Sequence, residues 1–333
     1  MFGIHMRFLP SPGDGGEIDR LVAQREEVLL ELAAKCHIAL TIVDLREQFD
    51  KAVVVPFIEA YRRGLTPNPC ILCNPRIKFG LLQDEALGLG AERLATGHYV
   101  RIFPPARSDS DRFQLRRAND PSKDQSYFLM GLSQEQLAHS CFPLGELTKS
   151  ETLAWAEQTG VKSLISEDSQ EICFIPSGSY PDFLRRRAGG DQAPRGGPIL
   201  DLDGNLLGEH KGIYSYTVGQ RRGLGIPSTE PYYVIGIEPG RNALRIGRAK
   251  DLYSEMCIVS KVNWVSISRP ETPITCQVRI RNLHKPAPAE VSLVDDNSVR
   301  VRFSTPQRAV TPGQAAVFYA DDLLLGGGMI ERS

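Results

Sequence analysis

The chain has almost no net charge and no long apolar run. Its 333 residues carry 39 Lys and Arg against 40 Asp and Glu, which gives a formal net charge of -1. This balance excludes a uniformly basic surface, so contacts with nucleic acid must come from local patches. Residues 1–8 do not resemble a secretory leader, and the sequence contains no run of about 18 apolar residues. These absences predict a cytoplasmic protein without a membrane segment.

Basic residues do gather at a few places. Each group is either a contact for nucleic acid or an ordinary solvated surface, and both interpretations stay open. The groups are residues 185–187, residues 221–222, and Arg279, Arg281, His284 and Lys285.

The sequence has seven cysteines but only one closely spaced pair. Cys70 and Cys73 form a C-x-x-C, and no second C-x-x-C or C-x-x-H accompanies it. A tetrahedral structural zinc would therefore lack ligands, although the same spacing also occurs in iron–sulfur sites and redox pairs. An odd number of cysteines without a secretory signal fits a reducing compartment. A structural metal-binding protein built on this pair remains one alternative.

Residues 66–80, T-P-N-P-C-I-L-C-N-P-R-I-K-F-G, place both thiols just after two prolines. Proline lacks an N–H and pushes its predecessor toward extended geometry, so we expect Cys70 and Cys73 to lie on a loop. A helix is expected to follow over residues 76–87. Its positive N-terminal end would lower the pKa of a nearby thiol and improve it as a nucleophile or metal ligand.

The first half of the chain alternates short apolar strands with amphipathic helices. This order predicts a parallel α/β sheet with right-handed crossovers, in which ligands bind beyond the carboxyl ends of the strands. Gly97 and His98 follow one of these strands. We expect residues 127–159 to be mostly helical, with Leu153 and Trp155 in the core, and Cys173 to lie in a loop or strand. The expected strands are 2–7, 38–45 and 93–96, and the expected helices are 18–35, 52–63 and 76–87.

From about residue 182 the sequence becomes richer in glycine and proline, and short alternating segments replace helical ones. This pattern predicts a small β-barrel or a pair of barrels. Because 333 residues exceed one ordinary core, we expect three domains. They are an α/β nucleotide-binding domain over 1–175, a central β-rich domain over 176–245 and a β-barrel over 246–333. The expected strands are 233–237, 274–280, 291–294, 299–303 and 315–319.

Six segments, taken together and in order, closely resemble the tRNA-specific 2-thiouridylase family (MnmA). The resemblance runs from residue 2 to G-G-G-x-I-E at 326–331. The segments are T-P-N-P-x-x-x-C-N at 66–74, A-T-G-H-Y-V-R at 95–101, K-D-Q-S-Y-F-L at 123–129, E-I-C-F-I at 171–175, G-x-x-x-x-T-V-G-Q-R-R-G-L-G-I at 212–226 and T-P-G-Q-A-A-V-F-Y at 311–319.

The resemblance implies a tRNA-uridine 2-sulfurtransferase that uses ATP with Mg²⁺. Such an enzyme adenylylates the 2-oxo oxygen of the wobble uridine, and AMP departs when sulfur attacks C2. The resemblance implies that Cys173 carries a persulfide supplied by an upstream sulfur donor protein. It also implies that Cys73 is the partner nucleophile, which can release that sulfur and close a Cys73–Cys173 disulfide. The implied substrates are the anticodon arms of tRNAs for Lys, Glu and Gln.

The resemblance also implies binding residues. Met6 and Gly97 match nucleotide-binding positions, and residues 68–70 (Asn68, Pro69 and Cys70) match the segment that meets the target base. Unstacked anticodon bases are the usual targets of sequence-specific RNA readers. His98 as a turn histidine and Gln314 as a polar barrel residue remain alternatives. The positions that match tRNA contacts are His98, Lys123, Asp124, Gln125, Arg281, Asn282 and Gln314.

Two features depart from the family pattern. The family's first strand, its S-G-G-V-D-S phosphate-binding loop and the following helix have no counterpart, and residues 2–7 resemble the second strand. Without the backbone N–H groups of such a loop, the ATP pyrophosphate lacks its cradle. We expect that the native chain begins farther upstream; the alternative is a non-catalytic tRNA-binding remnant.

The second departure is Cys70, which stands where much of the family has aspartate. Together with Cys73 and Cys173 it gives three thiols that could converge at one site. Three cysteines that leave one iron open would suit a 4Fe–4S cluster carrying an extra sulfide. A cluster-dependent route is therefore an alternative to the persulfide route.

Overall fold

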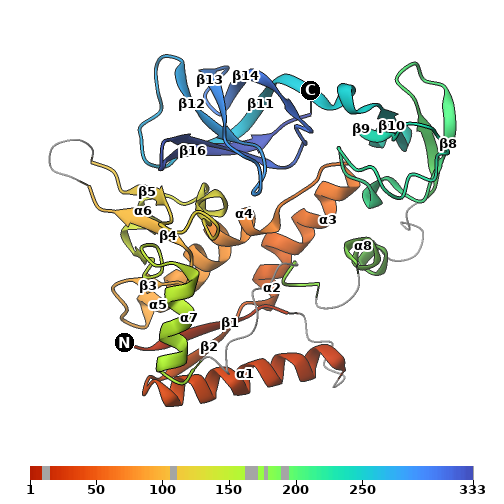
Figure 1. Cartoon of the computed structure of the whole chain (residues 1–333). Coiled ribbons are helices and arrows are strands. Elements are labelled where there is room, and N and C mark those ends of the chain that lie inside the picture. The colour runs from red at the N-terminus through yellow and green to blue at the C-terminus, as the bar shows by residue number, and fades with distance from the viewer. Residues whose placement is uncertain (10–15, 106–110, 162–171, 176–178, 189–194, 333) are drawn as a thin grey trace. The chain divides into compact units, whose positions relative to one another are not determined.

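The structure is a computed structural model that describes residues 1–9, 16–105, 111–161, 172–175, 179–188 and 195–332. The chain forms two compact units (Figure 1). Unit 1 comprises Met1–Val55 and Pro69–Ser177, and unit 2 comprises Pro56–Asn68 and Gly178–Ser333. Within the described ranges, no helix is both long and apolar enough to cross a membrane.

Unit 1 mixes short strands with helices. Its elements are β1 (Gly3–Arg7), α1 (Glu17–Lys35), β2 (Leu40–Asp44), α2 (Arg46–Phe49), the π-helix η1 (Asp50–Val54), α4 (Pro69–Cys73), the π-helix η2 (Asn74–Leu81), α5 (Leu82–Gly88), β3 (Leu94–Ala95), β4 (Val100–Phe103), β5 (Gln114–Arg117), the 3₁₀ helix η3 (Ser126–Leu129), α6 (Gln134–Ala138), β6 (Ser140–Cys141) and α7 (Lys149–Gln158).

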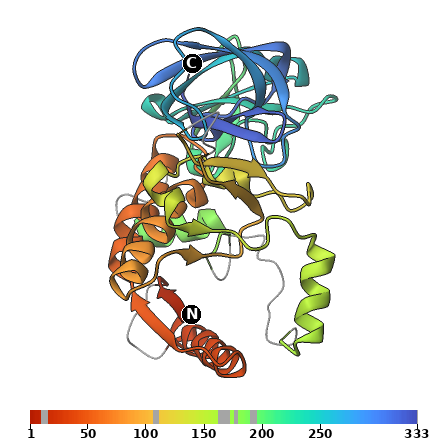
Figure 2. The same ribbon diagram turned by 90° about the vertical axis from the view of Figure 1, so that its left-hand side faces the viewer.

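Parallel pairing joins the strands as expected for an α/β domain. β1 pairs in parallel with β2, with Gly3 opposite Leu40, and α1 connects them and lies along one face of the pair (Figures 1 and 2). The Arg7 guanidinium donates to the Glu26 carboxylate at 2.7 Å, which ties the end of β1 to α1. β3 and β6 form a second parallel pair. The predicted parallel α/β class is therefore confirmed.

The expected loop around the C-x-x-C is wrong, because Pro69 begins helix α4. Proline is well suited to the first position of a helix, where its missing N–H has no intrahelical partner to lose. α4 then continues directly into η2. Gly80 breaks the helical geometry of η2, with φ -102° and ψ -109°. A Cβ on Gly80 would lie 2.9 Å from the Pro75 carbonyl oxygen, so the bend requires glycine there.

The expected helical stretch over 127–159 is only partly correct. β6 interrupts it, because Ser140 and Cys141 are extended and pair with β3. Leu129, Leu132 and Leu137 are buried as expected. Leu153 and Trp155 on α7 are instead 39% and 61% exposed. Their helical spacing therefore did not mark a core face.

We expect Thr148→Ala to destabilise α7 by about 1 kcal/mol, because Thr148 is the N-cap of a capping box with Glu151. The Thr148 hydroxyl accepts from the Glu151 N–H, and the Glu151 carboxylate accepts from the Thr148 N–H. Urea unfolding compared with Gln158→Ala, at the exposed last residue of α7, measures the effect. The control should change the free energy of unfolding by less than about 0.5 kcal/mol. Equal effects would contradict the cap.

Unit 2 is built mainly from strands. Its elements are α3 (Val55–Arg62, entering from unit 1), α8 (Tyr180–Ala188), β7 (Gly197–Leu200), β8 (Leu206–His210), β9 (Tyr233–Glu238), β10 (Ala243–Gly247), β11 (Tyr253–Trp264), β12 (Ile274–Arg279), β13 (Ala287–Leu293), β14 (Ser298–Arg308), β15 (Ala315–Ala320), β16 (Leu323–Ile330) and the 3₁₀ helices η6 (Ile213–Ser215), η7 (Pro239–Arg241) and η8 (Ala249–Leu252).

The central part of unit 2 is a four-stranded sheet in the order β8-β7-β10-β9. Ile199, Val234 and Leu244 are fully buried in its core. The sequence predicted only β9 of these strands and did not predict helix α8. α8 carries three consecutive arginines in its last turn, which gave no apolar pattern to recognise.

The C-terminal part of unit 2 is a closed antiparallel barrel, which confirms the prediction. Its strand order is β11-β14-β13-β12-β15-β16, and β11 pairs again with β16. Alternate residues point inward, as on β13, where Ala287, Ala289 and Val291 are buried. Closure of the barrel brings the backbones of β11 and β16 close together. A Cβ on Gly326 would lie 2.4 Å from the Asn263 carbonyl oxygen, so this position requires glycine.

Residues 56–68 belong to unit 2 although they come from the first half of the chain. The Tyr61 ring stacks on Tyr180, with centroids 4.9 Å apart. The Thr66 N–H donates to the Pro312 carbonyl at 2.9 Å, and the Thr66 carbonyl accepts from the Gln314 side-chain amide at 2.8 Å. Aromatic packing and backbone pairing therefore anchor this segment in unit 2.

Candidate active site

The two cysteines of the C-x-x-C lie three residues apart on helix α4 and differ in their exposure to solvent. Cys73 is buried, with Ile71 and Asn74 buried beside it in sequence, whereas Cys70 is exposed. The Asn74 side-chain amide donates to the Phe128 carbonyl at 2.9 Å, which holds the start of η2 against η3. Residues three apart on a helix share one face, so Cys73 lies deeper than Cys70 along the same face, and its thiol is shielded from solvent.

Cys173 lies at a turn that two buried neighbours anchor. The Ile175 N–H donates to the Ile172 carbonyl at 2.9 Å, and Phe174 and Ile175 are buried. The Phe174 ring packs edge-on against Phe49, with centroids 5.7 Å apart. Cys173, which precedes these two residues, remains exposed. Side-chain packing thus fixes the position of this thiol within unit 1.

The three thiols lie close enough to act on one another electrostatically, although about a hundred residues separate Cys73 from Cys173. Burial is the main cause that raises the pKa of Cys73 to about 12, and the charges of Cys173 and Cys70 make smaller contributions in the same direction. Burial is the main cause that raises the pKa of Cys173 to about 11, and the charge of Cys70 makes a smaller contribution in the same direction. Burial also raises the pKa of Cys70. All three are free thiols.

The expected lowering of the thiol pKa values is therefore wrong. Cys173 and Cys70 reach the surface, yet the surrounding protein removes enough water from their sulfur atoms for desolvation to dominate. Thiols of this kind stay protonated at neutral pH in the free protein. Chemistry that needs a thiolate then depends on a nearby cation or on bound substrate.

Lys78 is a cation that influences all three thiols. Its charge lowers the pKa of Cys70, Cys73 and Cys173, opposing the effect of burial. Lys78 follows Cys73 by five residues along the π-helix η2. Bonding from residue i to i+5 widens the turn, so residues five apart share a face, which an α-helix would not allow. Sequence reasoning missed Lys78 because the α-helical period places it away from Cys73.

The Gly97 turn lies near the same lysine. Gly97 is exposed, and His98 accepts or donates a hydrogen bond between Nδ1 and the Thr96 hydroxyl at 2.8 Å. Burial is the main cause that lowers the pKa of His98 to about 3, and the charge of Lys78 makes a smaller contribution in the same direction. His98 is therefore neutral at physiological pH. Lys78 thus interacts with the predicted nucleotide turn as well as with the thiols.

Among the residues that the structure describes, no three His, Cys, Asp or Glu side chains are arranged to hold a metal ion. The three thiols therefore interact electrostatically without forming a ligand set in this arrangement. The 4Fe–4S alternative, whose cysteine ligands lie farther apart than those of a single ion, stays a hypothesis.

Comparison with known proteins covers nearly the whole chain. Residues 2–177 match the tRNA methyl transferase HUP domain, residues 182–248 the tRNA methyl transferase PRC-barrel domain, and residues 254–330 the aminomethyltransferase beta-barrel domain. The chain is 44% identical over 303 residues to a protein of Geotalea uraniireducens, covering 91% of this chain and 79% of that protein. That relative is named tRNA-specific 2-thiouridylase MnmA. The chain belongs to the MnmA family.

Other MnmA relatives are similar to the same extent. A protein of Chloroflexus aggregans is 47% identical over 291 residues, covering 87% of this chain and 80% of that protein. A protein of Syntrophotalea carbinolica is 43% identical over 319 residues, covering 96% of this chain and 87% of that protein. Both are named tRNA-specific 2-thiouridylase MnmA. The family assignment therefore rests on all three domains.

The remaining residues predicted from the MnmA resemblance fall into both units. In unit 1, Met6 lies on β1 opposite Val43 of β2. Asp124 and Gln125 hold a turn, because Asp124 accepts from the Ala118 N–H at 3.3 Å and Gln125 accepts from the Tyr99 N–H at 2.9 Å. Packing of this turn thus accounts for both side chains.

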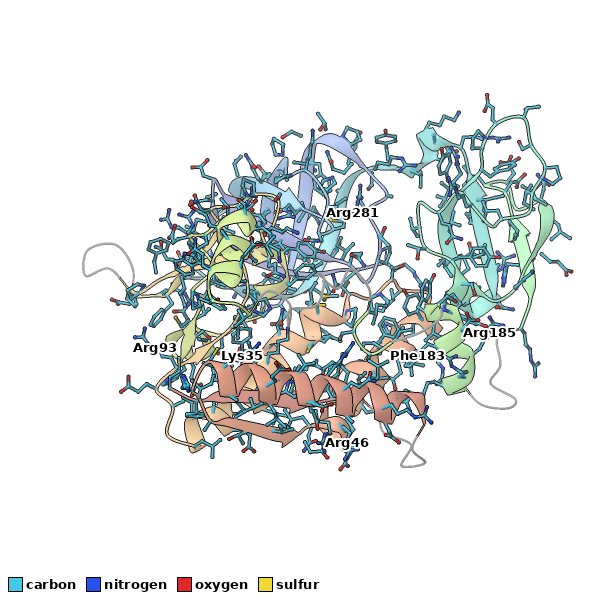
Figure 3. All side chains as sticks on the ribbon, turned by 60° about the horizontal axis from the view of Figure 1, so that its bottom comes forward. Lys35, Arg46, Arg93, Phe183, Arg185 and Arg281 are labelled. Atoms are coloured by element: carbon cyan, nitrogen blue, oxygen red, sulfur yellow. The ribbon has the colours of Figure 1, made fainter. Side chains whose placement is uncertain are left out.

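In unit 2, the predicted tRNA contacts of the MnmA resemblance lie on the barrel. Arg281 follows β12 and donates to the Arg308 carbonyl at 3.2 Å (Figure 3). The Asn282 side-chain oxygen is buried without a hydrogen-bond partner. Gln314 uses its side-chain amide to hold Thr66. Asn68 ends the segment that Thr66 belongs to, and Pro69 begins α4.

The raised pKa of Cys173, about 11, predicts a strong pH dependence of its alkylation. Below that pKa the thiolate fraction rises about tenfold per pH unit, so iodoacetamide should react about 100-fold faster at about pH 9 than at about pH 7. Peptide mass spectrometry of the Cys173 peptide measures the rate, with a cysteine-containing model peptide as reference. A plateau at the reference peptide's pKa would contradict the shift.

Proposed function

We propose that this protein is an ATP-dependent tRNA-uridine 2-sulfurtransferase that replaces the 2-oxo oxygen of the wobble uridine with sulfur. The main support is the proximity of Cys73 and Cys173 around Lys78, in a chain of the MnmA family. The HUP-domain match supports the use of a nucleotide. We assign the nucleotide to Met6 and Gly97, with Mg²⁺ accompanying ATP, and the target base to residues 68–70.

The proposed reaction has three steps. The 2-oxo oxygen of uridine attacks the α-phosphorus of ATP, and pyrophosphate leaves with its electron pair. The terminal sulfur of a persulfide on Cys173 then attacks C2, and AMP departs with the former 2-oxo oxygen. The Cys73 thiolate attacks the Cys173 sulfur, which breaks the sulfur–sulfur bond and leaves the transferred sulfur on C2. The resulting Cys73–Cys173 disulfide is reopened by an external thiol reductant, and a sulfur donor protein reloads Cys173.

The persulfide route is preferred over the cluster route because it needs only the Cys73 and Cys173 thiols, whereas the cluster route also needs Cys70 and bound iron. Anaerobic reconstitution with iron and sulfide, followed by metal analysis, tests this choice. Protein that is fully active without iron supports the persulfide route. Activity that appears only with about four iron atoms bound per chain would favour the cluster.

We assign catalysis to residues 1–175, and tRNA binding to residues 176–245 and 246–333. His98 and residues 123–125 contribute from the first part, and Arg281, Asn282 and Gln314 from the last. The proposed substrates are the anticodon arms of tRNAs for Lys, Glu and Gln, and the proposed location is the cytoplasm. Free cysteines throughout the chain support a reducing compartment.

The decisive experiment incubates the protein with unmodified tRNA, ATP, Mg²⁺ and a persulfide donor. Nucleoside mass spectrometry then measures 2-thiouridine, and omission of ATP is the control. We expect ATP-dependent 2-thiouridine at the wobble position. Protein that binds tRNA tightly but forms no 2-thiouridine would instead support a tRNA-binding remnant.

A further inference from the structure

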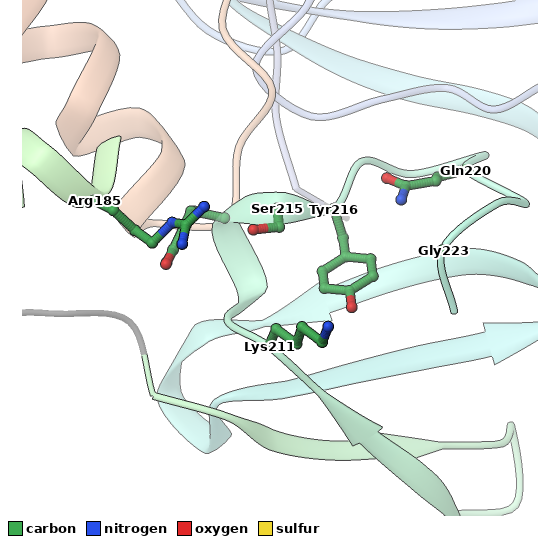
Figure 4. Close-up of a pocket in the computed structure, with 7 residues that line it drawn as sticks. Arg185, Lys211, Ser215, Tyr216, Gln220 and Gly223 are labelled. Atoms are coloured by element: carbon green, nitrogen blue, oxygen red, sulfur yellow. The ribbon is translucent and has the colours of Figure 1, made fainter. Parts of the chain in front are cut away.

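Unit 2 contains a pocket that none of the assigned residues occupies. It encloses about 370 Å³ between α8 and the segment that follows β8 (Figure 4). In Figure 4 the Tyr216 hydroxyl points toward the ammonium end of Lys211, and Gln220 lies on the opposite side of the ring. Volumes of about 300 Å³ or more are typical of sites for small groups. Its lining residues are Arg185, Lys211, Tyr214, Ser215, Tyr216, Gln220 and Gly223.

The pocket brings together two sequence features that the proposed function leaves unexplained. Arg185 belongs to the basic group at 185–187 on α8. Gln220 and Gly223 belong to the T-V-G-Q-R-R-G segment at 217–223, and residues 214–216 directly precede that segment. Gly223 has φ +81°, a left-handed conformation that glycine adopts without strain. Gln220 closes the turn, because its amide donates to the Arg222 carbonyl at 2.9 Å. The segment is thus shaped to line the pocket.

The chemistry of the lining favours an anion. Arg185 and Lys211 are both cations, and no carboxylate is among the residues that line the pocket. Arg185 also forms an ion pair with Asp182 on α8, which orients its guanidinium. Tyr214, Ser215 and Tyr216 add hydroxyl groups that can donate hydrogen bonds. Arginine, lysine and hydroxyl donors are the usual partners of phosphate oxygens.

Further arginines adjoin the lining residues in the sequence. Arg186 and Arg187 follow Arg185 on α8, and Arg221 and Arg222 lie in the turn that ends at Gly223. All four are exposed. A single small anion would use only the pocket, whereas a polyanion would use the pocket and this border together. Several positive charges next to one pocket favour the phosphate backbone of a nucleic acid as the ligand.

We propose that this pocket binds a backbone phosphate of the tRNA, held by Arg185 and Lys211 with the hydroxyls of Tyr214 and Tyr216. The inference rests on the proposed function, because it takes tRNA to be the substrate. It assigns a role in substrate binding to the 185–187 and 221–222 basic groups. Phosphate contacts of this kind position the RNA without reading its sequence.

The test compares Arg185→Gln and Lys211→Gln with the wild-type protein in tRNA binding over a range of KCl concentrations. The double variant should weaken tRNA binding about tenfold, and each single change should make the salt dependence shallower by about one unit of slope. Arg185→Lys and Lys211→Arg keep the charge and should restore most of the affinity. Arg241→Gln is the matched control, because Arg241 is an exposed arginine outside the pocket that pairs with Glu238. It should leave binding unchanged.

Two further measurements separate the possible failures. Urea unfolding of each variant checks that the fold persists, and the charge-keeping variants serve where a glutamine variant does not fold. If the wild type forms 2-thiouridine but the glutamine variants keep full tRNA affinity and salt slope, the pocket proposal is overturned. If those variants instead lose affinity for AMP or inorganic phosphate and keep it for tRNA, the RNA assignment is also overturned. If the wild type binds tRNA but forms no 2-thiouridine, only the proposed function fails.

Discussion

Cys173→Ser should reduce 2-thiouridine formation by at least about 1,000-fold, because a serine hydroxyl cannot carry a persulfide and stays protonated at neutral pH. Adenylylation of the tRNA does not use this thiol. We therefore expect the variant to keep ATP-dependent release of pyrophosphate in the presence of tRNA. Nucleoside mass spectrometry and a pyrophosphate assay on the same samples measure the two steps separately.

Cys73→Ser should reduce 2-thiouridine formation by a comparable factor, but it should block a later step of the reaction. Without the Cys73 thiolate, the sulfur–sulfur bond between Cys173 and the tRNA cannot be opened. A covalent protein–tRNA adduct that dithiothreitol releases should therefore accumulate in a single turnover. Denaturing gel electrophoresis with and without dithiothreitol detects it.

The matched control for both variants is Cys141→Ser. Cys141 is a free, partly buried thiol of β6 in the same unit, and no step of the proposed reaction uses it. We expect this variant to keep wild-type activity. Thiolation that survives in Cys173→Ser, with Cys73 intact, would show that Cys173 does not carry the transferred sulfur.

Lys78→Met should slow thiolation at neutral pH by roughly tenfold, because the thiols lose the nearby cation that favours their thiolate form. The sign follows from the charge of Lys78, which lowers the pKa of Cys73 and Cys173 against the larger effect of burial. Its removal raises both pKa values, so less thiolate is present at a given pH. The activity should return as the pH rises, and the pH profile should move in the alkaline direction.

The measurement for Lys78→Met is the alkylation rate of Cys73 and Cys173 across pH, read alongside thiolation. Lys78→Arg keeps the charge and should keep most of the activity. Lys51→Met is a suitable control, because Lys51 is an exposed lysine of the same unit that pairs with Glu47 on the helix surface. A Lys78→Met variant that loses activity equally at every pH would point to a structural role instead.

Local patterns in the sequence were enough for the fold class and the family. Alternating apolar residues over 274–319 predicted barrel strands, since alternation directly reflects one buried face. The order of six motifs indicated the family, because the order of motifs can be read directly from the sequence. The barrel strands β11 and β16 were not predicted. β16 contains three consecutive glycines. They allow close contact with the neighbouring strand, and they hide the apolar–polar alternation by which a strand is recognised.

The sequence alone determined the family and the α/β and barrel classes, and it predicted which thiols react, because motifs and periodicity involve neighbouring residues. Only the tertiary structure decided that α4 is a helix, that Trp155 is exposed, and that residues 56–68 belong to unit 2. It also decided the thiol pKa values and the role of Lys78. Burial and electrostatic interaction depend on everything that surrounds a group, including residues about a hundred positions away, and no local pattern records those surroundings.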